Sequence, residues 1–440
     1  MTLPAFYLNW QRHWLLVLWL ALGSLGAVAA HPMPNSMVLL TVQAHRIEAA
    51  VQIPLTELQP AFGHAVGDSS AHLVARLGPE LRAYLAQHIK LQSPDGRLWA
   101  VAVGALGVQQ TQNPLTGPYR ELTAQVRLVP PAGADVRQFL LRYDAVLHQV
   151  VTHKILVAVR QDWATGQVAA DAEPAQVGII QLDVRNNVIP PLPVNLAAGS
   201  AWAGFRAMVQ LGTQHIAEGT DHLLFLLVLL LPAPLLVAGR RWGSFGGVRY
   251  GLRRLLLIVT AFTLGHSLTL LLGTLGWVRL PSQPVEMLIA GSILVSAAHA
   301  WRPLFPGREA WVAAGFGLVH GLAFAGTLVS LHLDAGPMAL SLLGFNLGIE
   351  LMQLFVIGLT LPWLMLLSRT PAYAWVRVGG AALAALAAAG WLAERASGRA
   401  NSLGQTAGQV AAYAPYGLAL LAGLALLLTW RQRLVRQPGA

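Results

Sequence analysis

Histidine and carboxylate side chains lie close together in one stretch of the chain whose surroundings are apolar. The stretch contains His215, Glu218, Asp221 and His222, directly before the apolar run 223–231. In a helix, with about 100° of rotation per residue, His215, Glu218 and His222 share one face and Asp221 lies at its edge. Side chains of these types can bind a divalent metal ion or relay protons.

Further polar side chains occur in the apolar stretches that follow. His266 has Ser267 beside it, and His320 lies between two glycines. The remaining members are Glu286, Asn346, Glu350 and Gln353. The last three are spaced i, i+4 and i+7 and therefore line one helical face. An ionisable side chain at bilayer depth costs about 2.5–3.5 kcal/mol on insertion scales, so a group of them requires mutual pairing or a function.

Six of these residues fall at comparable depth on four predicted helices, and we take them as candidate metal ligands. They are His215, Asp221, His222, His266, His320 and Glu350. The residues expected to support them are Glu218, Ser267, Glu286, Asn346 and Gln353. Because the chain contains no Cys, any metal must be bound through nitrogen and oxygen. Imidazole with carboxylate suits nickel, cobalt, zinc or copper, and ligand type alone does not select among them.

The composition identifies the surroundings of these residues as a membrane. Of the 440 residues 55% are hydrophobic and only 11% are charged, whereas soluble domains carry about 25% charged residues. An entirely soluble protein is therefore excluded, and the lipid bilayer is the first expected partner. The net charge of +10 comes from 27 Arg and 2 Lys that form no single basic face, so nucleic acid is not an expected partner.

The first part of the chain is more polar and predicts an exported domain. Residues 1–30 have a basic start, a short apolar core and small residues at the end, which is typical of a signal peptide. Residues 31–195 predict a β-rich domain, in which alternating residues at 37–43 and 47–53 indicate a hairpin and 80–88 looks helical. The proline-rich segment 189–193 predicts a stiff linker that continues neither a strand nor a helix.

Residues 200–440 predict a transmembrane domain with about seven helices. The segments are 205–231, 253–277, 284–301, 311–331, 338–367, 374–393 and 412–430. With the first domain exported, seven crossings leave the C-terminus in the cytoplasm. The predicted inner loops then carry 12 Arg and the outer loops 3, in agreement with the positive-inside rule. The predicted fold class is a polytopic α-helical membrane protein with an N-terminal β-rich extracytoplasmic domain.

The motifs of the helical part resemble the HupE/UreJ family of hydrogenase- and urease-accessory membrane proteins. The matching stretches are 212–222, Phe262-Thr263-Leu264-Gly265-His266-Ser267, Val285-Glu286 with Ile289-Ala290, His320-Gly321, and Phe345-Asn346 with Glu350. The core of the resemblance covers about 205–367, and the exported domain makes the chain similar to a longer branch of the family. The resemblance implies a permease-like protein of the bacterial inner membrane with a periplasmic first domain. It further implies nickel or cobalt as the metal, and metalloenzyme maturation proteins as partners.

The residues leave two other functions open. In an intramembrane zinc-dependent hydrolase, the four histidines would hold zinc, Asp221 or Glu350 would activate water, and Ser267 would orient the substrate. In a sensor or scaffold, the external domain would bind a partner and the intramembrane polar groups would hold the helices together. Metal uptake separates the permease from these two alternatives, because neither of them moves an ion.

Overall fold

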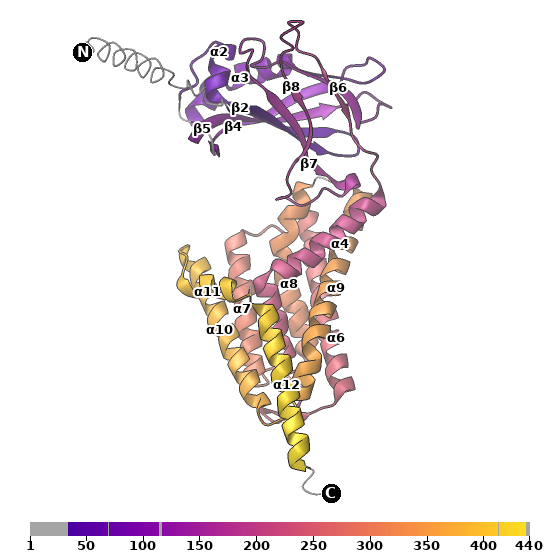
Figure 1. The fold of residues 1–440 in the computed structure, drawn as a ribbon, viewed down its shortest axis with the longest axis vertical. Helices are drawn as coiled ribbons and strands as arrows, with labels where there is room; N and C mark the ends of the chain where they lie inside the picture. Colours follow the sequence, from indigo (N-terminus) through magenta and orange to yellow (C-terminus); the bar gives the residue numbers. More distant parts are fainter. Residues whose placement is uncertain (1–33, 69, 114–116, 332, 412, 437–440) are drawn as a thin grey trace, which may run out of the picture.

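The structure is a computed structural model that describes residues 34–436 except 69, 114–116, 332 and 412. In it a β-rich domain lies at one end of a bundle of helices (Figure 1). We call the end of the bundle next to this domain the domain end, and the opposite end the far end. The predicted signal peptide, 1–30, lies outside the described residues.

Two β-sheets make up most of the first domain. Six strands form one sheet in the order β4-β5-β2-β1-β7-β8, and three form a second in the order β3-β6-β9. The bounds are β1 (Ser36–Val42), β2 (Ile47–Pro54), β3 (Ile89–Gln92), β4 (Ala100–Asn113), β5 (Gly117–Val129), β6 (Gln138–Tyr143), β7 (Ile155–Asp162), β8 (Ala175–Ile180) and β9 (Leu192–Asn195). The predicted hairpin is confirmed, because β1 and β2 pair antiparallel around Leu39 and Ala50.

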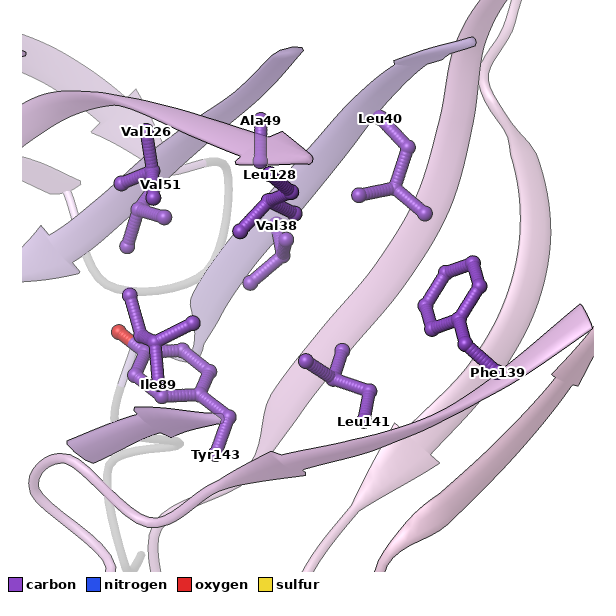
Figure 2. Close-up of a pocket in the computed structure, with 10 residues that line it drawn as sticks. All are labelled: Val38, Leu40, Ala49, Val51, Ile89, Val126, Leu128, Phe139, Leu141 and Tyr143. Atoms are coloured by element: carbon purple, nitrogen blue, oxygen red, sulfur yellow. The ribbon is translucent and has the colours of Figure 1, made fainter. Parts of the chain in front are cut away.

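The core of this domain lies between the two sheets. Alternate residues of β1, such as Val38 and Leu40, face Phe139 and Leu141 of β6, and Figure 2 shows these apolar side chains pointing toward one another. Helices α2 (Leu55–Phe62) and α3 (Ser70–His88) add to the same core. The β-rich character that alternation predicted is therefore confirmed, and α3 extends well before the predicted helical residues.

The proline-rich segment is not a free linker, and this prediction is wrong. Strand β9 contains Pro193 and pairs with β6 at the edge of the smaller sheet, where a proline is tolerated because one side of an edge strand needs no N–H donor. After it, Ser200 donates its backbone N–H to the carbonyl of Ala164 over 2.7 Å. The Trp163 indole packs so closely on Gly204 that a Cβ there would lie within 2.7 Å of the ring. The domain is thereby fastened to the first helix of the bundle.

Five helices among the described residues are long and apolar enough to cross a bilayer. They are α6 (Val248–Thr274), α7 (Ser282–Trp301), α9 (Ala335–Leu367), α10 (Tyr373–Ser397) and α12 (Ala414–Arg436). The other elements of the bundle are α4 (Ala201–Glu218), α5 (Thr220–Leu230), the hairpin β10 (Leu235–Ala238) and β11 (Arg241–Phe245), α8 (Glu309–Ser330) and α11 (Ser402–Ala411). The predicted count of seven is thus supported only as far as these five, and the first predicted segment is two helices.

Glycines set the closest helix contacts in the bundle. On α4 and α9, Gly212 and Gly348 each face the backbone of the other helix, and on α6 and α8, Gly265 and Gly317 do the same. A Cβ at any of these four positions would overlap a carbonyl oxygen of the neighbour. Small residues allow such backbone approach inside a membrane, where dispersion contacts replace the hydrophobic effect as the main attraction between helices.

Candidate metal centre

The junction between α4 and α5 positions the first two histidines. The sequence predicted one continuous helix here, but the chain leaves helical geometry at Gly219 (φ −71°, ψ 92°) and starts α5 at Thr220. His215 therefore lies in the last turn of α4 and His222 in the first turn of α5, with their ring centroids 4.6 Å apart. A Cβ on Gly219 would lie 2.6 Å from Nδ1 of His222, so only glycine fits this junction.

Asp221 fixes the orientation of the His222 ring. Its Oδ1 accepts the backbone N–H of His222 and, at 2.9 Å, the ring Nδ1–H. With the proton on Nδ1, the lone pair of the ring is on Nε2, which is buried and has no hydrogen-bond partner. A carboxylate that holds one imidazole nitrogen while the other faces a cation is the usual arrangement around protein metal ions.

Ser292 does the same for His320. The hydroxyl of Ser292 on α7 donates to the carbonyl of Ile289 over 2.7 Å, so it can only accept from Nε2–H of His320, at 3.1 Å. The free lone pair of His320 is then on Nδ1, which is buried without a partner. No pattern in the sequence singles out Ser292, because a serine in an apolar helix usually bonds its own backbone and no periodic signal distinguishes this one.

Four imidazoles from four helices meet at this place. His222 lies between His215 and His320, with ring centroids 4.6 and 5.1 Å away, and His266 on α6 lies 6.3 Å from His215. His222, His266 and His320 are at most 8% exposed. Each of the four rings has at least one buried nitrogen with no hydrogen-bond partner in the described structure. Such groups are rare in folded proteins because an unpaired buried donor or acceptor costs about 1–3 kcal/mol.

The rings are gathered but are not arranged around one point. Among the described residues, no three His, Asp or Glu side chains are placed closely enough to be ligands of a single ion. The least buried side of the cluster is the α4–α5 junction, where the side chain of Asp221 is 30% exposed and Glu218 is exposed. The donor types and the unpaired nitrogens fit a divalent cation, and the rings would have to turn toward it.

Glu350 does not lie in this cluster. It accepts a hydrogen bond from Thr260 of α6 over 3.3 Å, and Gln353, one turn on, accepts one from Thr263. Thr260 precedes His266 by six residues, which is about 9 Å along a helix. Asn346 bonds the carbonyl of its own helix through its amide nitrogen, and its Oδ1 is buried without a partner. The stripe on α9 thus extends from the cluster toward the far end.

Two of the supporting residues also have partners of their own. Glu286 forms an ion pair with Arg395 of α10 at 3.0 Å, on the domain side of the bundle and away from the histidines. Ser267 donates to the carbonyl of Thr263 within α6. The structure therefore brings His215, Asp221, His222, His266 and His320 together, and places Glu286 and Glu350 elsewhere.

The apolar helices and the β-rich domain define the class of the protein, a polytopic helical membrane protein with an N-terminal β-rich region. Residues 194–395 match the family model described as HupE / UreJ protein. The match covers a little under half of the chain, from β9 to α10, and confirms the resemblance to the HupE/UreJ family that the motifs of this part indicate. No curated protein and no solved structure matches the chain.

Proposed function

We propose that this protein is a permease for a divalent transition-metal cation, with nickel or cobalt favoured by the family. The proposed ligands are His215, His222, His266 and His320, together with Asp221. One observation supports this proposal most: four imidazoles on four helices have buried ring nitrogens that no protein group satisfies. A single cation could take a lone pair from one nitrogen of each ring.

The arrangement lets a cation bind after rotation of the rings. Their centroids are 4.6 to 6.3 Å apart, and imidazoles bound to one ion through bonds of about 2.0–2.1 Å have centroids at similar separations. Binding would turn the rings inward, and release would let them relax. Asp221 and Ser292 would hold the proton positions of His222 and His320 throughout, so that a lone pair is available when the cation arrives.

We infer that the cation enters at the domain end, taken as the outer side of a bacterial inner membrane. Arginines cluster at the far end: Arg254 pairs with Glu309 at 2.6 Å, Arg377 bonds carbonyls at the end of α7, and Arg369 lies over Phe245 of the hairpin. An excess of arginine marks the cytoplasmic side of membrane proteins. Delivery to metalloenzyme maturation proteins inside the cell would follow from this direction.

Uptake into sealed vesicles tests the proposal. Vesicles containing the purified protein should accumulate radioactive nickel or cobalt, and His222→Ala should abolish accumulation. The control is His299→Asn. His299 is also buried in the bundle and its Nε2 also has no hydrogen-bond partner, but it lies outside the cluster and its Nδ1 accepts the N–H of Leu304. Uptake equal to that of empty vesicles would contradict the permease, and lipid or amide hydrolysis without uptake would favour a zinc-dependent hydrolase.

A further inference from the structure

Two helix pairs in the bundle repeat the same contact, residue for residue. In the first pair, Gly212 of α4 faces the carbonyl of Phe345, three residues before Gly348, and Gly348 faces the carbonyl of Val209, three residues before Gly212. Gly348 also faces the backbone nitrogen of Thr213, the residue after Gly212. The contact is reciprocal, and the two helices run in the same direction, from the domain end to the far end.

In the second pair, α6 and α8, the same register recurs. Gly317 faces the carbonyl of Phe262, three residues before Gly265, and Gly265 faces the carbonyl of Ala314, three residues before Gly317. Gly265 also faces the backbone nitrogen of Leu318, the residue after Gly317. This pair runs in the opposite direction, so a local two-fold relation matches the contact of α8 to that of α4 and the contact of α6 to that of α9.

The repeat relates two of the histidines and two phenylalanines. His215 follows Gly212 by three residues, and His320 follows Gly317 by three. Each histidine contacts the phenylalanine of its paired helix: the His215–Phe345 centroids are 5.4 Å apart, and the His320–Phe262 centroids 5.1 Å. Because the two pairs run in opposite directions, Phe345 lies on the domain side of His215, whereas Phe262 lies on the far side of His320.

Aromatic rings therefore form one layer on the domain side of the histidines and another on the far side. On the domain side, Phe324 stacks on Phe345 at 4.2 Å and touches His215 at 4.7 Å. On the far side, Phe225 contacts Phe262 at 5.2 Å and Phe316 at 5.8 Å. His266 lies midway, 6.2 Å from Phe262 and 6.3 Å from Phe345.

We propose that Phe324 and Phe345 form the outer gate of the metal centre, that Phe225, Phe262 and Phe316 form its inner gate, and that the two open in turn. This inference rests on the proposed function. Packed aromatic rings leave no polar path for a hydrated cation, so at least one layer must move for each passage. The two glycine contacts support the alternation, because the same backbone packing occurs at both layers and faces opposite ends of the bundle.

Thiol labelling from one side at a time tests the gates. The chain has no Cys, so Ser292→Cys, beside His320, places a single thiol between the two layers. A charged, membrane-impermeant methanethiosulfonate is applied to either side of sealed vesicles. Adding Phe345→Ala should raise labelling from the domain side at least about tenfold and leave the far side unchanged, and Phe262→Ala should do the reverse. Phe355→Ala is the control on α9, since Phe355 is 58% exposed on the outer surface of the bundle.

If the labelling rate rises equally from both sides, or does not rise in either variant although both fold, the gate proposal is wrong. If an alanine variant does not elute as a single folded species, Phe345→Leu and Phe262→Leu are compared in the same way, and loss of side selectivity there rejects the proposal. Labelling does not depend on the cargo. Side-selective labelling, together with no nickel or cobalt uptake by the protein that retains Ser292, would keep the gates and reject the cation. Uptake by that protein with unselective labelling would keep the permease and reject the gates.

Discussion

A buried histidine beside a carboxylate occurs in both parts of this protein, and the two pairs are used differently. In the β-rich domain, Nδ1 of His153 lies 3.5 Å from Glu57, and its Nε2 is 2.8 Å from the hydroxyl of Ser36. All three side chains are at most 3% exposed. In the bundle, Asp221 holds Nδ1 of His222 at 2.9 Å, but Nε2 faces other imidazoles and bonds none of them.

The difference shows what turns a buried histidine into a candidate ligand. The Nε2 of His153 is used by a protein hydroxyl, so this ring ties β1 to the loop before β7 and offers no lone pair toward a site. His222 keeps its lone pair and shares its surroundings with histidines from three other helices. A single acid–histidine pair is thus a poor signal of function, and the number of converging imidazoles with free nitrogens is a better one.

The largest expected effect tests the close glycine contact between α4 and α9 in the bundle. In Gly348→Ala, the new methyl group would overlap the backbone of α4, which cannot move aside, and we expect the bundle to lose about 3 kcal/mol of unfolding free energy. Gly358→Ala, on the same helix, has open space around it and should be neutral or slightly stabilising. Thermal unfolding in detergent measures both. Equal melting temperatures for the two variants would contradict the close-contact interpretation of α4 and α9.

The second prediction tests the carboxylates. Asp221→Asn removes the charge that orients His222, and we expect nickel affinity to fall about 10- to 100-fold, the usual cost of losing such a partner. Glu57→Gln, the corresponding change in the domain, should leave nickel affinity unchanged. Calorimetric titration of both variants measures this. Similar losses in the two would show that the domain pair also takes part in binding.

The third prediction concerns pH and the domain alone. Burial lowers the pKa of His153 from 6.5 to about 4, so between these values the unfolded chain binds a proton that the folded domain does not. Stability is therefore lost as the pH falls from about 6.5 toward about 4, at most about 1.4 kcal/mol per pKa unit. Burial also raises the pKa of Glu57, which favours proton uptake by the folded domain and offsets part of the loss. A net loss of about 1–2 kcal/mol is expected.

Hydrogen exchange of the β1 and β7 amides in the full chain, at pH 7 and pH 5, measures this loss. His153→Gln removes the titrating ring, so its exchange rates, corrected for the intrinsic effect of pH, should change less than those of the wild type. An equal change in both proteins would assign the pH dependence to other groups.

The smallest expected effect concerns Glu350. Because Thr260, its partner, precedes His266 by about 9 Å along α6, Glu350→Gln should change nickel affinity less than about twofold. The amide oxygen of glutamine can still accept the hydrogen bond from Thr260. A loss as large as that expected for Asp221→Asn would return Glu350 to the ligand set that the sequence predicted.

Much of the fold follows from local patterns. Alternation located β1 and β2 within a residue, and hydropathy located α6, α7 and α9 closely. The errors fall where tertiary contacts override a local rule. Pro193 enters a strand because that strand is at the edge of a sheet. The first predicted span breaks at Gly219, where the His222 ring and the carbonyl of His215 leave no room for a side chain.

The candidate site was predicted less completely. Helical spacing pointed to His215, Asp221 and His222, and comparable depth added His266 and His320; the structure brings these five together. The same reasoning included Glu350, because depth along a helix was estimated without knowing how α9 is shifted and rotated against α6. It omitted Ser292, whose role depends on a contact with His320, 28 residues away in sequence.

The sequence by itself determined which part of the chain is polar and which is apolar enough to cross a bilayer. It also determined the family that the helical part resembles, and which ionisable side chains are too costly to bury in lipid unless they are paired or functional. Those properties are sums over local composition and spacing. Only the tertiary structure decided which nitrogens remain free, which carboxylate leaves the cluster, and how two glycine-packed helix pairs place aromatic layers on either side of the histidines. These features depend on the register and direction in which helices pack against one another. Backbone contacts at single glycines set that register, and no local sequence pattern encodes it.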